Sequence, residues 1–569
     1  MKKMLSNKIY IFYAVMLLGA CTSLLVTNLS YDGEYQLAMA YRLMKGDSLI
    51  TEMWEPHQTS AFLCMIFMKI FVTVTGSTTG IVLFLHAVGL IIRLGISIYL
   101  SKVIGKVTSE IAGMIAGVMF LLISPKDLLI PEFSNMQIWF TTLMCLLLVQ
   151  YLLNKKMWML IASAVCLCLG VLSYPSVLLT YFVIVALLMV YSEKKNRDIL
   201  IYTGVCAGIG AAFVGYLLVS VGWSAIVDCL PRALALEPSH TINLADKVIA
   251  NVISVAKILG GLVIVGLAGW AVQSVILRIC KDNSDEKSRN GDGLWICIAW
   301  CILMLILLVN VLQAKRHGGM SYPFLVIAGL GLWKRRLLSR REKVVFDAAF
   351  WTGVSCLAAT FVLSDHGILQ AIPYMKLAVC GSVLPLYRWF GQCNVKRYLK
   401  KLFLICIHVF LLIMVFRSVY VHVPISGRSQ ITSIMSDMAL IRSGPALGVI
   451  TNEHGAAMQR DSMTEWKQYI QEGDTIWILG EPVDTLGYLY EDVEVGAPTV
   501  MSTPTYNEEL LYYWEINPHK YPDVVILASG FGELSWDLQK NQWLMNWLEK
   551  EYRAHRVVDG NYWRYYFRE

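Results

Sequence analysis

The sequence predicts a polytopic α-helical membrane protein with a soluble α/β domain at its C-terminal end. Of the 569 residues, 56% are hydrophobic and 16% charged, whereas about a quarter of a soluble chain is charged. Apolar runs near the ~20 residues that cross a bilayer recur from residue 9 to residue 419. Because hydrocarbon offers the backbone no hydrogen-bond partners, we expect these runs to be helices.

The first apolar run, 9–29, follows Lys2, Lys3 and Lys8. It continues beyond the length of a typical signal peptide and many further runs follow it, so we expect an uncleaved helix. The basic residues then place the N-terminus in the cytoplasm and the loop 30–79 outside.

The next apolar stretch, 59–75, is short and carries Lys69 at its middle. Clusters of Lys and Arg follow every second later run, and basic loops favour the cytoplasm. This pattern requires that 59–75 does not cross, so we expect an interfacial helix there. About thirteen crossings remain and put the C-terminus outside. They are roughly 9–29, 80–100, 109–123, 136–153, 157–173, 175–191, 199–222, 248–277, 294–312, 320–333, 346–363, 366–387 and 402–419.

The chain therefore divides into a transmembrane catalytic domain, 1–420, and an extracytoplasmic domain, 421–569. In the second part the apolar runs 447–450, 475–479 and 523–527 predict strands, and 463–471 predicts a helix. The alternation predicts a small α/β domain.

Charge and motif content exclude several classes of function. The net charge of +7 comes from Lys and Arg in short loops, which orient helices, so we expect no nucleic-acid partner. The 14 cysteines form no CxxC pair and no metal-ligand spacing. Walker A, GxGxxG and GxSxG motifs are all missing from the sequence, which argues against nucleotide-driven transport and against a dinucleotide-fold enzyme.

Two acidic residues, Asp32 and Glu34, follow the first span in the motif SYDGEY at 30–35. One interpretation is helix capping, since Asp is a good N-cap and Glu complements the helix dipole. The other is chemical: a carboxylate at the bilayer surface can deprotonate an acceptor hydroxyl or hold a cation.

With these residues, and with WEPHQ at 54–58, the chain resembles the GT-C superfamily of membrane glycosyltransferases. The resemblance is strongest to lipid A aminoarabinose transferases and protein O-mannosyltransferases. It implies that Asp32 is the catalytic carboxylate with Glu34 beside it, and that Glu55 and His57 contact the substrate. It also leaves room for a divalent cation (Mg²⁺, Mn²⁺ or Zn²⁺), with Asp32 and Glu55 as candidate ligands. An interfacial place for His57 is the alternative.

The second outer loop, SPKDLLIPEFSN at 124–135, offers Glu132 and Asn135, because members of this superfamily often carry a second polar site there. A plain turn explains these two residues equally well. Further along, QAKRHGGMSYP at 313–323 places Lys315 and Arg316 outside, against the charge bias. This stretch, with Tyr322, resembles the superfamily's contact to the donor phosphate, a role that suits Arg and Lys. Binding of anionic headgroups is the alternative.

We therefore expect a multi-pass protein of the cytoplasmic membrane that transfers a hexosyl or pentosyl group from a polyprenyl-phosphate-linked sugar, with inversion, to a glycan, lipid or protein acceptor. Asp32 acts as general base, and Lys315 and Arg316 hold the phosphate. Two alternatives stay open. A surface-glycan polymerase or ligase uses similar donors, and a lipid or sugar transporter or flippase would carry ionisable residues within its spans, of which few are evident (Lys69, Arg93, Lys257).

Overall fold

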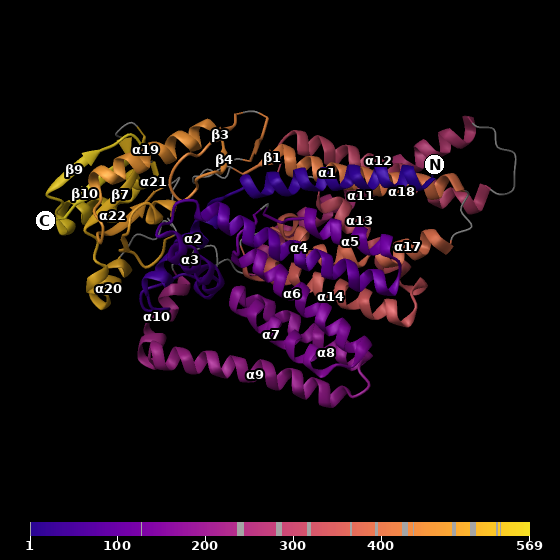
Figure 1. The fold of residues 1–569 in the computed structure, drawn as a ribbon, viewed down its shortest axis with the longest axis horizontal. Coiled ribbons are helices and arrows are strands. Elements are labelled where there is room, and N and C mark those ends of the chain that lie inside the picture. Colours follow the sequence, from indigo (N-terminus) through magenta and orange to yellow (C-terminus); the bar gives the residue numbers. More distant parts are fainter. Residues whose placement is uncertain are drawn as a thin grey trace.

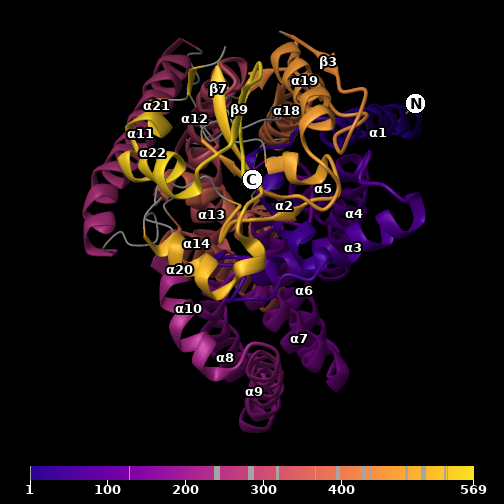
Figure 2. The same ribbon diagram turned by 90° about the vertical axis from the view of Figure 1, so that its left-hand side faces the viewer.

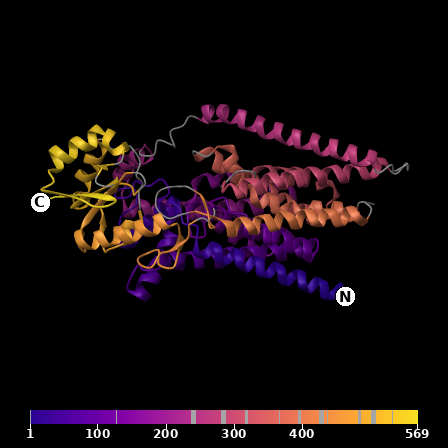
Figure 3. The same cartoon turned by 90° about the horizontal axis from the view of Figure 1, so that it is seen from above.

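A long helical bundle carries a sheet-containing C-terminal region at one end, and the N-terminus lies at the opposite end (Figure 1). The computed structural model describes all residues except 1, 127, 236–243, 280–286, 316–319, 365–366, 393–396, 424–430, 436, 481–484, 501–507, 531–532, 535 and 569. Most helices run along the long axis, and α11 flanks the bundle when it is seen from above (Figure 3).

Eighteen α-helices precede the sheet region in the described part of the chain. They are α1 (Lys2–Val26), α2 (Tyr31–Lys45), α3 (Ala61–Thr75), α4 (Ile81–Val107), α5 (Glu110–Leu122), α6 (Phe133–Asn154), α7 (Met157–Ser173), α8 (Leu179–Tyr191), α9 (Lys195–Ser220), α10 (Trp223–Ala235), α11 (Leu244–Ile279), α12 (Lys287–Leu312), α13 (Ser321–Lys334), α14 (Arg340–Leu363), α15 (Ile368–Ala371), α16 (Lys376–Gly381), α17 (Val383–Gln392) and α18 (Arg397–Tyr420).

Seven helices within the described residues are long and apolar enough to cross a membrane, or up to nine if each of two bent pairs is one span. The bent pairs are Ala14–Val26 with Tyr31–Lys45, at 58°, and Ile368–Gly381 with Val383–Gly391, at 43°. Several other predicted spans coincide with shorter apolar helices, such as Glu110–Leu122. The polytopic helical architecture is thus confirmed, whereas the count of about thirteen spans stays a prediction.

The stretch 59–75 is predicted not to cross the membrane, but the helical segment Gln58–Thr75 is long and apolar enough to do so. Its helix α3 nevertheless lies at the end of the bundle beside the C-terminal region and extends sideways (Figures 1 and 2). Ile66, Ile70 and Val74 are exposed along one face at four-residue spacing. This position favours an interfacial helix over a span.

Contacts between helix ends group the predicted inner and outer loops at opposite ends of the bundle. Glu342, at the start of α14, accepts hydrogen bonds from Arg388 of α17 (2.5 Å) and Thr108 after α4 (3.3 Å). At the other end, the Tyr420 hydroxyl of α18 donates to the Leu312 carbonyl of α12 (3.5 Å). Which of the two ends faces the cytoplasm stays a prediction.

The C-terminal region holds a mixed sheet in the order β6-β5-β7-β10-β9, with β8 paired to β7. Strand β5 is parallel to β6 and β7, and β10 is antiparallel to β7 and β9. The predicted strand 475–479 is β5, and the predicted strand 523–527 overlaps β7. The predicted helix 463–471 overlaps the end of α19, whereas only Ile450 of the run 447–450 lies in a strand, the short β4. The bounds are β1 (Val421–His422), β2 (Thr432–Ser433), β3 (Ala439–Leu440), β4 (Ile450–Thr451), α19 (Glu453–Tyr469), β5 (Thr475–Leu479), β6 (Glu494–Val495), α20 (Glu509–Ile516), β7 (Val524–Gly530), β8 (Glu533–Leu534), α21 (Trp536–Lys540), α22 (Gln542–Trp547), β9 (Arg556–Asp559) and β10 (Trp563–Phe567).

Candidate active site

The N-terminal turn of α2 presents Asp32. The chain bends between α1 and α2, and Asn28 adopts a left-handed conformation there (φ 65°), which asparagine tolerates better than most residues. The N-cap position is occupied by Ser30. Asp32 therefore does not serve as the helix cap, and its side chain remains 31% exposed.

Lys126 faces this carboxylate from the segment 123–132, which joins α5 to α6. Its Nζ lies 2.8 Å from Oδ2 of Asp32 and 4.3 Å from the centre of the Phe133 ring, and its side chain is 8% exposed. Burial opposes the charge on Lys126, but the nearby Asp32 carboxylate, with Glu132, raises the pKa of the ammonium above its usual value. Lys126 is therefore protonated at neutral pH.

The described residues of the segment, 123–126 and 128–132, are buried within the bundle, so their carbonyl groups need protein donors. Arg93 of α4 (2.8 Å) and Lys376 of α16 (3.1 Å) both donate to the carbonyl of Ile123. Next to them, α4 approaches the segment closely: a Cβ added at Gly89 would lie 1.5 Å from the carbonyl oxygen of Leu129. These contacts fix the backbone that carries Lys126.

Glu132 and Asn135 hold the other end of the segment. The Glu132 carboxylate caps α6 by accepting from the backbone N–H groups of Ser134 (2.8 Å) and Asn135 (2.7 Å). The Asn135 amide donates to the carbonyls of Leu128 (3.1 Å) and Ile130 (2.9 Å). In this structure both predicted site residues support the segment.

Glu132 also belongs to the electrostatics of the site. Burial raises the pKa of its carboxyl to about 7, with Lys126 opposing the shift and Asp32 adding to it. A carboxyl group that titrates near neutral pH beside a charged pair is typical of catalytic sites.

Three rings from distant segments stack beside the ion pair. His57 lies 4.3 Å from Phe133 at an interplanar angle of 10°, and 5.4 Å from Tyr174 at 13°. Lys126 lies over the same Phe133 ring. The Phe133 ring therefore contacts both His57 and the partner of Asp32. This confirms neither a substrate contact nor a lipid contact for His57, but it places the residue at the site.

Glu55 lies at the contact between α2 and the C-terminal region. Its oxygens accept from Tyr35 (3.0 Å), Arg42 (3.4 Å), Thr499 (2.7 Å) and the backbone N–H of Val500 (2.6 Å). The side chain is fully buried. Four donors surround this carboxylate, so the structure does not direct it towards Asp32.

The remaining predicted residues are dispersed. Glu34 is buried within α2. Lys315 is exposed just after α12, and Arg316 lies outside the described residues. The ring of Tyr322 packs against α11, where a Cβ at Gly261 would lie 3.2 Å from it.

Sequence reasoning missed Lys126, Phe133 and Tyr174. A signal for Lys126 was present, because it is a basic residue in a predicted outer loop, which is the argument that singled out Lys315. The rings carried no such signal, since aromatic residues near a membrane surface are common.

The described side chains do not fit a divalent cation. Among them, no group of three or more His, Cys, Asp or Glu side chains is arranged to hold a metal ion. The two candidate ligands have separate partners, Lys126 for Asp32 and Arg42 with three other donors for Glu55. A buried ammonium against Asp32 also opposes a second cation there.

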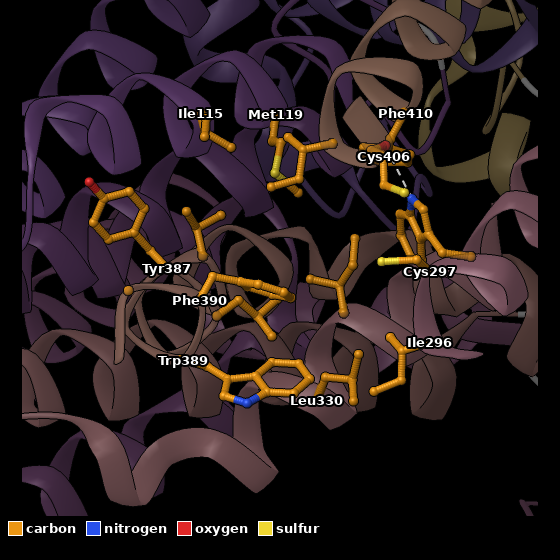
Figure 4. A pocket seen from close by; sticks show the side chains of 16 residues that line it. Ile115, Met119, Ile296, Cys297, Leu330, Tyr387, Trp389, Phe390, Cys406 and Phe410 are labelled. Atoms are coloured by element: carbon orange, nitrogen blue, oxygen red, sulfur yellow. Dashed lines mark hydrogen bonds between the residues drawn. The ribbon is translucent and has the colours of Figure 1, made fainter. Parts of the chain in front are cut away.

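A separate apolar pocket of about 280 Å³ lies between α5, α12, α13, α17 and α18. Cys297, Trp389, Phe390 and Cys406 are among the side chains around it, and Trp300 donates to the carbonyl of Cys406 (3.2 Å; Figure 4). None of its lining residues belongs to α2 or to the segment 123–132. Its lining holds no carboxyl, imidazole, ammonium or guanidinium group.

No family model matches the chain, and no curated protein matches it in sequence. ArnT from Cupriavidus metallidurans bound to undecaprenyl phosphate is 9% identical, with a TM-score of 0.47, over 99% of this chain and 98% of that one. The archaeal oligosaccharyltransferase AglB from Archaeoglobus fulgidus, in complex with an inhibitory peptide and a dolichol-phosphate, is 11% identical, with a TM-score of 0.43, over 92% of this chain and 70% of that one.

AglB is an oligosaccharyltransferase, and the structures of both neighbours hold a lipid phosphate. At these identities and TM-scores they do not define an activity for this chain.

Proposed function

We propose that the chain is a membrane glycosyltransferase that moves a sugar from a polyprenyl phosphate to an acceptor hydroxyl at the outer face of the cytoplasmic membrane. The observation that carries this proposal is the ion pair between Asp32 and the buried Lys126. The pair brings a proton acceptor in the first turn of α2 and a cation from the segment before α6 to 2.8 Å from each other. The donor is of the same chemical class as the lipid in the ArnT structure.

The reaction is a single displacement. The acceptor oxygen attacks the anomeric carbon, the bond from that carbon to the phosphate oxygen breaks, and the configuration inverts. The acceptor proton passes to the Asp32 carboxylate, and polyprenyl phosphate leaves with the bonding electrons. General-base catalysis of this kind contributes about 10²- to 10⁴-fold.

Lys126 is suited to stabilise the leaving phosphate, because a buried cation stabilises developing negative charge strongly. When a donor binds, its phosphate competes with Asp32 for the ammonium, and the carboxylate becomes available to the acceptor hydroxyl. Lys315 and Arg316 then serve as an outer contact to the phosphate, with Tyr322 supporting α13. The His57 stack forms a wall of the site, and Glu34 lies behind Asp32 in α2.

The proposal includes the predicted topology, with about thirteen crossings and the region 421–569 outside. Under this arrangement Asp32, Lys126 and Lys315 share one side of the membrane with the donor headgroup. Sugar and acceptor identity are not specified by these residues.

The test uses the purified full-length chain in lipid nanodiscs, with a labelled polyprenyl-phosphate-linked sugar and a membrane extract as acceptor. Asp32→Asn keeps the shape of the side chain but removes the base, so release of polyprenyl phosphate should fall by about 100-fold or more. Arg564→Ala, in an exposed pair with Asp559, is the control and should release at the wild-type rate. Wild-type release by Asp32→Asn would refute the mechanism, and movement of the lipid without release would favour a transporter.

A further inference from the structure

The junction between α2 and the C-terminal region contains four buried charges. They are Arg42, Asp47, Glu55 and Lys520, called here the junction network. Their side chains are each at most 3% exposed. Two come from the end of α2 and the turn after it, one from the loop before α3, and one from the turn after α20.

Arg42 is the centre of the network. Its Nε donates to Asp47 (2.7 Å), its Nη1 to the carbonyl of Pro498 (3.2 Å), and its Nη2 to the carbonyl of Glu52 (2.5 Å). The Tyr513 hydroxyl of α20 lies 3.4 Å from Nη2. One guanidinium thus joins α2, the outer loop and two segments of the C-terminal region.

Glu55 and Lys520 complete the junction. Glu55 binds the chain at Thr499 and Val500, as described above, and also accepts from the hydroxyl of Tyr35 in α2. Lys520 donates to Asp47 (2.6 Å) and to Glu494 of β6 (3.1 Å). Each of the four buried charges therefore contacts a group on the other side of the junction.

Burying these charges is a poor way to gain stability, because the cost of removing them from water offsets most of their attraction. What such a network supplies is a defined geometry, since only one arrangement satisfies every donor and acceptor. Here the geometry concerns α2. Tyr35 lies one turn after Asp32, and Arg42 lies ten residues after it, about 15 Å along a rigid helix.

The opposite end of α2 is tied to the same region. Oδ1 of Asn28, in the bend before α2, accepts from the backbone N–H of Val423 (3.0 Å), just after β1. Along the helix, the Tyr41 hydroxyl donates to the carbonyl of Val493 (3.0 Å). The C-terminal region thus contacts the bend before α2, the helix itself and the turn after it.

We propose that the C-terminal region is a working part of the transferase, because the junction network holds α2 and thereby sets the Asp32 carboxylate against Lys126 and the substrate. Arg42 and Glu55 are positioning residues in this arrangement, and they act through α2 rather than on the sugar. The proposal rests on the proposed function for the identity of the reaction. That the junction network holds α2 in place does not depend on that function.

Thr499 provides the mildest test, because Thr499→Val removes one donor to Glu55 with little change of volume, and Thr499→Ser restores it. Hydrogen–deuterium exchange of the full-length protein measures the grip on α2 directly. In Thr499→Val the amides of residues 31–45 should exchange roughly tenfold faster than in the wild type, and Thr499→Ser and Arg564→Ala should match the wild type. Glu55→Gln is a second variant that should act in the same direction.

The kinetic readout separates positioning from plain stability. In Thr499→Val, kcat for polyprenyl phosphate release should fall roughly tenfold, as expected for a displaced catalytic group, while KM for the labelled donor stays within about twofold. Unchanged exchange of α2 in both Thr499→Val and Glu55→Gln would overturn the proposal. Faster exchange with unchanged kcat would also overturn it, since the network would then be structural only. If the wild type released no polyprenyl phosphate, the proposed function would fail and the exchange result alone would decide this inference.

Discussion

The Asp32 carboxylate and the Lys126 ammonium meet at 2.8 Å although they come from segments more than ninety positions apart in the sequence. One residue can take a proton and the other can neutralise a phosphate, so a single contact holds both requirements of transfer from a lipid phosphate. Neither residue is held by its own segment alone. Asp32 depends on α2 and its junction, and Lys126 depends on the buried segment 123–132.

Replacing Lys126 with Met should reduce polyprenyl phosphate release by about 100-fold, because the leaving phosphate loses its buried cation. The protein should stay folded, since Asp32 is partly exposed and can be hydrated. The rate of release and the thermal unfolding midpoint measure the two effects. Lys102→Met, at an exposed lysine of α4, is the matched control. A Lys126→Met variant with full activity would show that the phosphate is held elsewhere.

Glu132 should make the stability depend on pH. Its carboxyl has a pKa of about 7 in the folded protein, against 4.5 for an unperturbed group, so the native state binds more protons between these values. The free energy of unfolding should therefore decrease as the pH rises through this window, by about 3 kcal/mol in total.

The check for Glu132 is denaturation in detergent at a series of pH values. Glu132→Gln removes the titrating group but keeps an oxygen for the backbone N–H groups of α6, so most of the slope should disappear. An identical slope in this variant would assign the titration to another group.

Gly89→Ala should displace the segment that carries Lys126. An added Cβ at Gly89 meets the carbonyl oxygen of Leu129 at 1.5 Å, whereas one at Gly95 in the same helix meets nothing within 4 Å. Overpacking of this kind costs about 1–3 kcal/mol or more, so Gly89→Ala should lower both the unfolding midpoint and the rate of release. Gly95→Ala should lower neither the unfolding midpoint nor the rate of release. Equal behaviour of the two variants would mean that the segment yields without consequence.

Removal of divalent cations should leave the rate of release unchanged. Asp32 faces an ammonium and Glu55 faces four donors, so neither has a free oxygen pair for a shared ion. The measurement compares release after exhaustive treatment with a chelator and after addition of Mg²⁺, Mn²⁺ or Zn²⁺. A chelated protein that loses activity and regains it with one of these ions would show that a metal takes part.

The general architecture was accessible from the sequence because it depends on local patterns. Apolar runs and basic loops predict helices and their orientation, and the runs at 475–479 and 523–527 predict two strands of the sheet. Asp32 was accessible for the same reason, since an acidic residue directly after a span is visible in a short motif.

The partners of these residues were not accessible, because they depend on contacts between distant segments. The contacts of Glu55 with Thr499 and Val500 join positions more than four hundred residues apart in the sequence. Lys376 sits inside a run predicted to span the membrane, and its role becomes clear only when it reaches the Ile123 carbonyl. The periodic pattern of apolar residues does not predict contacts between segments that are far apart in the sequence.

The length of α5 has a consequence for where chemistry takes place. With 13 residues it is about 20 Å long, whereas the hydrocarbon layer is about 30 Å thick. A helix that starts at the cytoplasmic surface and ends after this distance leaves Ile123 and the residues after it below the outer headgroups. In the proposed topology the proposed reaction centre lies within the outer leaflet, so a lipid-borne phosphate would reach Lys126 by lateral diffusion, while a water-soluble acceptor would have to enter the leaflet.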